Sequence, residues 1–311
     1  MLNPNLRIDH YFSFFFILLL FIISGSLVSS NWFNQDQISV TLIKPTASAQ
    51  IKPNTATTSA QLRQAISAQA VLVMDPINSQ VILSKNHQQP LFPASTTKLM
   101  TALVAREYYQ THQVMTAGPE IKTEGTTVGI KPGEVLTVKS LLAAILINSG
   151  NDAAMILAEH YPGGYQGFVN QMNLKAEELG LNHTHFTNPV GFDHEQQQTT
   201  AQDLAILSLE VMDDPLLKEL VSSQQSLITD LTGQFSHQIY NTNLLLQREN
   251  GVRGVKTGTT EQAGEVLITW WEWQSHPLLI IVMNSADRYQ DTELIMDWIK
   301  QAVVWEDLIS F

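Results

Sequence analysis

The chain has 311 residues, of which 44% are hydrophobic and 15% charged, an ordinary composition for a globular protein with a packed core. Its formal net charge of −12 at pH 7 argues against nucleic acid as a partner, because phosphate binding requires clustered Lys and Arg. The sequence contains no cysteine, which excludes disulfides, cysteine zinc sites and thiol catalysis.

An uncharged apolar run near the N-terminus, Tyr11 to Val28, is about as long as a bilayer-spanning helix. Arg7 is the single cation before it, and Asp9 partly offsets that charge, so the positive charge that would orient the segment in the membrane is weak. Ala47-Ser48-Ala49 has the small-x-small form of a cleavage site, but it lies well beyond the run. We expect residues 1–28 to be a membrane anchor or signal segment. The protein would then be extracytoplasmic, held at the cell membrane or, if cleaved, secreted to the periplasm or cell wall.

The next stretch, residues 29–62, is rich in Ser, Thr, Gln, Asn and Pro. Such a composition buries too little apolar surface to offset its ordering entropy, so a flexible linker is predicted. A folded domain is expected over residues 63–311. It opens with two β-branched runs, Ala70–Asp75 and Gln80–Ser84, separated by turn residues, which predicts a hairpin.

Helical periodicity dominates the middle of the domain. The predicted helices cover residues 95–108, 138–146, 152–161, 165–179 and 201–212. A second hairpin is predicted from residues 264–273 and 278–284, followed by a final helix over 291–309. Strands at both ends with helices between them predict an α+β fold. Its antiparallel sheet would be built from both ends of the domain, with helices on its faces and a helical subregion.

The motif Ser95-Thr96-Thr97-Lys98 begins the first of these helices. Because residues three apart share a helix face, the Ser95 hydroxyl and the Lys98 amine can touch. A serine hydroxyl becomes a nucleophile when a base takes its proton, and lysine can do so where its surroundings lower its pKa. Taken alone, the pattern fits a helix-capping serine beside a surface lysine better than a catalytic pair.

Two further motifs follow along the chain. Ser149-Gly150-Asn151 lies on a short loop where side chains can project into a cleft, although, taken alone, a turn that caps the next helix through Asp152 explains it better. Lys256-Thr257-Gly258-Thr259 precedes the apolar strand of the second hairpin. Glycine in a strand leaves room for a ligand backbone, lysine offers charge to a carboxylate, and a strand edge can pair with an extended peptide.

With these three motifs in this order, the chain resembles the low-molecular-mass penicillin-binding proteins, the serine D-Ala-D-Ala carboxypeptidase family. The likeness covers most of residues 65–305 and includes FPASTTKLMTAL, the FTNPVGF turn and GVKTGTTEQAGEVL. The run YPGGYQGFVNQMNLKAEELG is similar to the D-alanyl-D-alanine endopeptidase branch. The resemblance implies a fold like that of β-lactamases and DD-peptidases, with residues 63–311 as the catalytic domain.

The resemblance also implies catalytic roles. Ser95 would be the acylated nucleophile, Lys98 its general base, and Ser149 a proton relay to the leaving group. The backbone N–H groups of Ser95 and Thr259 would form the oxyanion hole. The implied substrates are peptidoglycan peptides ending in D-Ala-D-Ala, with β-lactam antibiotics as covalent inhibitors and with no metal or other cofactor.

The resemblance also implies five substrate-binding residues. Asn151 would hold the substrate amide, and Lys256 would support the electrostatics around the substrate carboxylate. Thr257, Gly258 and Thr259 would line the strand edge.

Other functions stay open. Some carboxypeptidases place an arginine near the terminal carboxylate, whereas the NTN segment here offers Thr242, which keeps an endopeptidase role open. A β-lactamase of class A would have aspartate where Gly150 stands, and Glu195 lacks the expected surroundings of a deacylating glutamate. A penicillin-sensing or cell-wall-binding module with little turnover is the alternative outside catalysis.

Overall fold

The structure is a computed structural model that describes residues 47–52, 57–119 and 124–307. The predicted membrane segment at residues 1–28 lies outside this range. Among the helices that the structure describes, none combines the length and the apolar character needed to cross a membrane.

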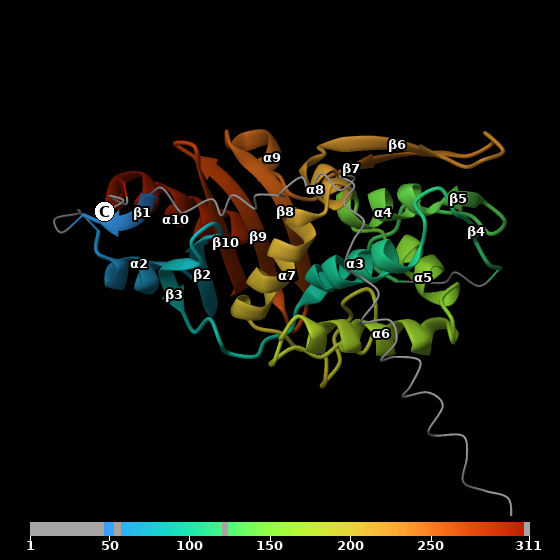
Figure 1. The fold of residues 1–311 in the computed structure, drawn as a ribbon, viewed down its shortest axis with the longest axis horizontal. Helices are drawn as coiled ribbons and strands as arrows, with labels where there is room; N and C mark the ends of the chain where they lie inside the picture. Colours follow the sequence, from blue (N-terminus) through green and yellow to red (C-terminus); the bar gives the residue numbers. More distant parts are fainter. Residues whose placement is uncertain (1–46, 53–56, 120–123, 308–311) are drawn as a thin grey trace, which may run out of the picture. The chain divides into compact units, whose positions relative to one another are not determined.

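A five-stranded antiparallel sheet forms the centre of the folded unit (Figure 1), in the order β3-β2-β10-β9-β8. Its strands are β2 (Ala70–Asp75), β3 (Gln80–Lys85), β8 (Val252–Thr260), β9 (Gly264–Trp273) and β10 (His276–Ser285). The two predicted hairpins are confirmed, and β2 pairs with β10, which joins the two ends of the domain in one sheet. The α+β prediction is therefore confirmed, and β8 lies at an edge of the sheet.

Side chains on both faces of the sheet are buried. Leu72 packs into the core formed by the helical region, whereas its neighbour Val71 packs into a second core with the C-terminal helix α10 (Arg288–Ala302) and α2 (Ser59–Ala65). Successive strand residues point to opposite faces, so a strand covered on both sides is apolar throughout. Figure 1 shows α7 (Ala201–Asp213) across one face, opposite α10.

The helical region lies on the α7 side of the sheet, and its five predicted helices are confirmed to within a few residues. Its elements are η1 (Ala94–Thr97), α3 (Lys98–Tyr108), α4 (Val138–Ile147), α5 (Asn151–Glu159), α6 (Gly164–Glu178), α7 and α8 (Pro215–Ser222). The short helix α9 (Leu245–Arg248) instead packs into the second core, with α10. The predicted helix at 95–108 is divided into the 3-10 turn η1 and the α-helix α3. This division puts Ser95 and Lys98 on two consecutive elements.

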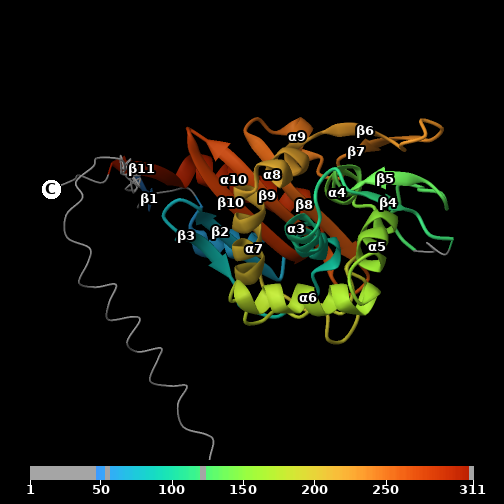
Figure 2. The same ribbon diagram turned by 45° about the vertical axis from the view of Figure 1, so that its right-hand side comes forward.

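Two short hairpins cover the end of the helical region away from β2 and β3 (Figure 2). They are β4 (Val114–Thr116) with β5 (Val135–Thr137), and β6 (Gln225–Thr229) with β7 (Ser236–Tyr240). The buried pair His237 Nε2 and Glu134 Oε2, 2.8 Å apart, joins them. These strands have only three to five residues, and most of their side chains are exposed or half-buried. Their apolar pattern is therefore too short to be recognised in the sequence.

A separate two-stranded sheet corrects two predicted boundaries. β1 (Ala47–Ile51) lies inside the predicted linker, and β11 (Val303–Asp307) lies inside the predicted last helix, which ends at Ala302. The described part of the folded unit accordingly includes β1 from Ala47 onward, which lies before the predicted start at residue 63. The linker prediction came from composition, and composition cannot reveal a strand whose partner lies at the other end of the chain.

Candidate active site

Ser95 and Lys98 lie at the junction of η1 and α3, with their side chains in contact. Lys98 Nζ is 2.9 Å from Ser95 Oγ and donates a second hydrogen bond, 2.7 Å long, to the carbonyl oxygen of Val190. Ser95 is half-buried, whereas Lys98 has no exposed surface. The hydroxyl can therefore be reached from outside while the amine is shielded from water.

Burial is the main reason that the pKa of Lys98 lies well below its usual value, because desolvation disfavours the ammonium form. The positive charge of Lys256 lowers the pKa further, and the carboxylate of Asp152 opposes both effects. A neutral amine in contact with a hydroxyl can accept its proton. The site thus has the arrangement of a nucleophile with its base.

The Ser149-Gly150-Asn151 motif joins α4 to α5, and Asn151 is the first residue of α5. Ser149 has φ +63°, a backbone conformation that costs energy for residues other than glycine, and it is buried. Asn151 Nδ2 donates to the carbonyl of Glu124 at 2.6 Å. Ser149 Oγ and Asn151 Oδ1 are buried without a hydrogen-bond partner among the described residues. Such groups are costly unless a water or a ligand satisfies them, which is typical of a binding site.

Asp152, the next residue, holds the neighbouring loop. Its carboxylate accepts hydrogen bonds of 2.8 to 3.1 Å from the backbone N–H groups of Val128, Gly129 and Ile130. Sequence reasoning gave Asp152 only a helix-capping role. The structure shows that it also ties the loop preceding β5 to the Ser149 motif and lies near enough to influence Lys98.

The third motif lies on the edge strand β8. Lys256 is buried, and its Nζ lies 3.2 Å from the carbonyl oxygen of Thr257. Burial and the charge of Arg288 lower the pKa of Lys256 to about 7. Thr257 Oγ1 lies 2.6 Å from Thr242 Oγ1, which places the NTN segment beside this strand. At neutral pH the lysine can therefore be present in both protonation states.

Gly258 brings β8 against the nucleophile. A Cβ atom at this glycine would lie 2.8 Å from the backbone nitrogen of Ser95 and 2.9 Å from Ala94 Cβ. The absence of a side chain is what permits this approach. Ser95, Lys98 and the Lys256–Thr259 edge consequently meet at one place.

Arg288 was not found by sequence reasoning. It extends from the start of α10, where Nη1 donates to the carbonyl of Gly258 at 2.8 Å and Nη2 donates to Thr259 Oγ1. Glu265 holds its Nε at 3.1 Å. An arginine therefore does lie beside the strand edge, but it comes from the C-terminal helix and not from the NTN segment. The sequence offered no signal for it beyond its position after the helix-capping Asp287.

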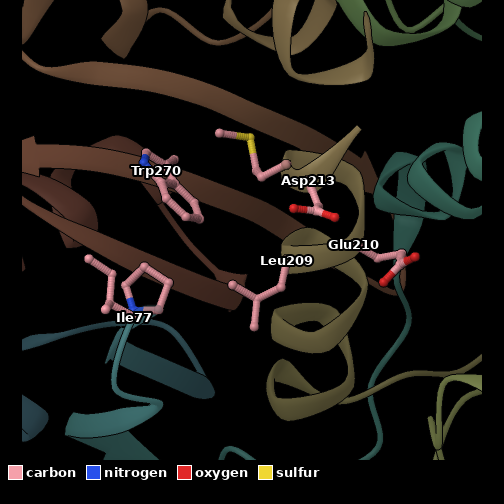
Figure 3. Close-up of a pocket in the computed structure, with 7 residues that line it drawn as sticks. Ile77, Leu209, Glu210, Asp213 and Trp270 are labelled. Atoms are coloured by element: carbon pink, nitrogen blue, oxygen red, sulfur yellow. The ribbon is translucent and has the colours of Figure 1, made fainter. Parts of the chain in front are cut away.

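A surface hollow elsewhere in the fold contains none of the motif residues. It has a volume of about 370 Å³ and lies between α7, the turn after β2 and β9 (Figure 3). Its lining residues are Pro76, Ile77, Leu209, Glu210, Met212, Asp213 and Trp270. Within the described ranges, no group of three His, Asp or Glu residues could hold a metal ion.

Comparison with known proteins identifies relatives of this chain. Residues 54–287 match the family model described as D-alanyl-D-alanine carboxypeptidase, Peptidase_S11. The D-alanyl-D-alanine endopeptidase of Escherichia coli is 30% identical over 277 residues, which cover 86% of this chain and 88% of that protein. The D-alanyl-D-alanine carboxypeptidase DacF of Bacillus subtilis is 34% identical over 202 residues, 63% of this chain. The match spans only about half, 52%, of the length of DacF.

The fold is also found among solved structures. The crystal structure of D-alanyl-D-alanine carboxypeptidase from Mycobacterium tuberculosis superimposes with a TM-score of 0.70 at 31% sequence identity. The superposition covers 78% of this chain and 95% of the other.

Proposed function

Since the chain belongs to the D-alanyl-D-alanine carboxypeptidase family, peptidase S11, we propose that it hydrolyses the D-Ala-D-Ala end of peptidoglycan stem peptides through an acyl-enzyme on Ser95. One observation carries the proposal. The fully buried amine of Lys98 lies 2.9 Å from a half-buried serine hydroxyl, with the edge strand β8 alongside. This arrangement supports transfer of an acyl group from a bound peptide to the serine.

In the proposed mechanism, neutral Lys98 takes the proton of Ser95 as Oγ attacks the carbonyl carbon between the two D-residues. The backbone N–H groups of Ser95 and Thr259 stabilise the oxyanion. The amide C–N bond then breaks as Ser149 gives its hydroxyl proton to the departing amine and takes the proton held by Lys98 in its place. Water adds to the resulting ester, which releases the shortened peptide and returns the proton to Ser95.

Substrate binding would use the edge strand β8 and the side chains around it. The peptide extends along β8 beside Thr257, Gly258 and Thr259, and Asn151 binds its amide. Lys256 and Arg288 supply positive charge for the terminal carboxylate. The contact of Arg288 with Thr259 supports this last role, because it places a guanidinium charge at the strand edge, where it would attract a carboxylate.

Endopeptidase activity on crosslinked peptides is the second candidate. Its support is the match to the E. coli endopeptidase, which extends over 88% of that protein, compared with 52% of DacF. The two activities share the acylation chemistry and differ in whether the leaving amine belongs to a free D-Ala or to a second stem peptide. β-Lactams, which present a strained amide to the same serine, would acylate the protein in either case.

We also propose that the catalytic domain acts outside the cytoplasm, where its substrate lies. The apolar segment at residues 1–28 would direct export, either as an anchor or as a cleaved signal. The catalytic domain would begin near Pro45, since β1 belongs to the compact unit.

Digestion of purified muropeptides, followed by mass spectrometry, tests the proposed activity. Loss of one D-Ala from pentapeptides indicates a carboxypeptidase, and conversion of crosslinked dimers to monomers indicates an endopeptidase. The Ser95→Ala variant should do neither. Covalent labelling by penicillin without either cleavage would contradict the proposal and favour a penicillin-sensing module.

A further inference from the structure

The turn from Asn188 to Phe192 lies directly behind the nucleophile and its base. Thr101 Oγ1 on α3 donates to the carbonyl of Pro189 at 2.6 Å, and Lys98 Nζ donates to the carbonyl of Val190 at 2.7 Å. Gly191 has φ +91°, and a Cβ atom there would lie 1.9 Å from the carbonyl oxygen of Ala94. The backbone of the turn therefore packs against the backbone that carries Ser95.

One side chain holds this turn in shape. Asn188 Oδ1 accepts hydrogen bonds from the backbone N–H groups of Val190 at 3.2 Å, Gly191 at 2.7 Å and Phe192 at 2.9 Å. Its Nδ2 donates to the carbonyl of Phe192 at 3.0 Å, which closes the turn from the other side. Asn188 is buried, with 8% of its surface exposed, so water cannot easily replace these bonds.

We propose that Asn188 is a positioning residue for acylation: by fixing the carbonyl of Val190, it orients the Lys98 amine toward Ser95. This inference rests on the proposed function, in which Lys98 is the general base. A neutral lysine amine has two N–H donors and one lone pair. When the Val190 carbonyl takes one of the donors, rotation about the last side-chain bond is restricted and the lone pair can face Ser95 Oγ.

If Asn188 positions Lys98, two substitutions of Asn188 should change acylation in different ways. A purely structural role would not predict this difference. Asn188→Ala removes the amide that fixes the turn, so the Val190 carbonyl is no longer held in place. The acylation rate should then be lower at every pH. Asn188→Asp keeps oxygen acceptors for the three N–H groups but adds an anion near Lys98. Like the charge of Asp152, that anion favours the ammonium form, so Lys98 would lose its proton at higher pH.

The test measures the second-order rate constant for acylation by a fluorescent penicillin as a function of pH, in the full chain and its variants. Asn188→Ala should lose about tenfold or more at the plateau, a part of the roughly 10²- to 10⁴-fold that a general base contributes. Asn188→Asp should approach the wild-type plateau, with the acidic limb of the profile moved to higher pH. Thermal unfolding is measured in parallel.

Asn173→Ala is the matched control. Asn173 also bonds to this segment, through the backbone N–H and carbonyl of Phe186, each at 2.8 Å, but it does not touch the turn at Val190. It should keep the wild-type rate and profile. Acylation by Asn188→Ala within about twofold of wild type, or an equal loss in Asn173→Ala, would overturn the inference.

Two further outcomes are distinguishable. If Asn188→Ala does not fold, Asn188→Asp decides, and a wild-type pH profile in that variant overturns the inference. If the wild-type protein itself is not labelled at Ser95, the proposed function fails and not only the role of Asn188.

Discussion

Gly258 and Ser95 lie in close backbone contact, so that a methyl group on Gly258 would lie 2.8 Å from the Ser95 nitrogen. The strand proposed to bind the peptide and the turn that carries Ser95 are thus fixed to each other. The same contact places the N–H group of Ser95 beside β8, where the oxyanion hole is proposed.

Replacing Gly258 by alanine should therefore separate these two elements. Overpacking of this kind costs about 1–3 kcal/mol of stability, which a domain of this size is expected to survive. We expect a folded protein whose penicillin acylation is about a hundredfold slower, because loss of one oxyanion donor has an effect of that order. Acylation kinetics and circular dichroism measure the two properties, and an unchanged acylation rate would show that the contact has no bearing on the reaction.

The pH dependence of acylation should follow the protonation of Lys98. The base must be neutral, so the rate should rise with pH as Lys98 loses its proton. Lys256→Met removes a positive charge that lowers the pKa of Lys98, so that pKa should increase and the acidic limb should move to higher pH. Asp152→Asn removes the opposing negative charge and should move the same limb to lower pH. The two pH–rate profiles are measured under identical conditions.

Shifts of the two variants in the same direction would contradict this account. Asp152→Asn keeps one oxygen acceptor for the N–H groups of Val128, Gly129 and Ile130, so the loop should stay in place. Its thermal unfolding serves as the control for that assumption.

Arg288 should determine the preference for a free C-terminal carboxylate. For Arg288→Gln we expect kcat/KM on a D-Ala-D-Ala peptide to fall about 10- to 100-fold, the effect of losing a charged hydrogen bond. The same peptide with an amidated C-terminus should be affected much less. Arg253→Gln is the matched control, because Arg253 is on the same strand β8 but is exposed and paired with Glu272. An equal loss on both peptides would exclude carboxylate recognition by Arg288.

The strand β1 should stabilise the domain without taking part in catalysis. Ala47 and Ala49 are buried, and the backbone of Ala49 forms hydrogen bonds of 3.0 and 2.7 Å with the side chain of Gln80. A chain starting at residue 53 should melt about 2–10 °C below one starting at Pro45, the shift expected for a loss of 1–3 kcal/mol. Both should be acylated at the same rate at low temperature. Equal melting temperatures would mean that β1 adds no stability.

The sequence revealed those features whose signal is local. The hairpins at β2–β3 and β9–β10 follow from apolar runs around turn residues, and the spacing of Ser95 and Lys98 placed the hydroxyl and the amine in contact. Features that depend on distant partners were not predictable in this way. β1 forms because β11 is available at the opposite end of the chain, and no pattern within residues 47–51 indicates it.

The same distinction applies to the candidate site. Motif spacing and family resemblance identified the residues at its centre, but Arg288 reaches Thr259 only because α10 packs behind the sheet. Asn188 was part of a recognised turn, yet its three backbone hydrogen bonds depend on the path of the folded chain. The residues that hold the reacting groups in place were visible only in three dimensions.

The most direct test is mass spectrometry of the intact protein after brief exposure to penicillin, with peptide mapping of the adduct and comparison with Ser95→Ala and Lys98→Ala. We predict one covalent adduct with the mass of the whole antibiotic on Ser95. It should be absent in Ser95→Ala and should form about 10²- to 10⁴-fold more slowly in Lys98→Ala, the usual contribution of a general base. An adduct on another residue, or acylation of Lys98→Ala at the wild-type rate, would contradict the claim that the buried Lys98 amine activates Ser95.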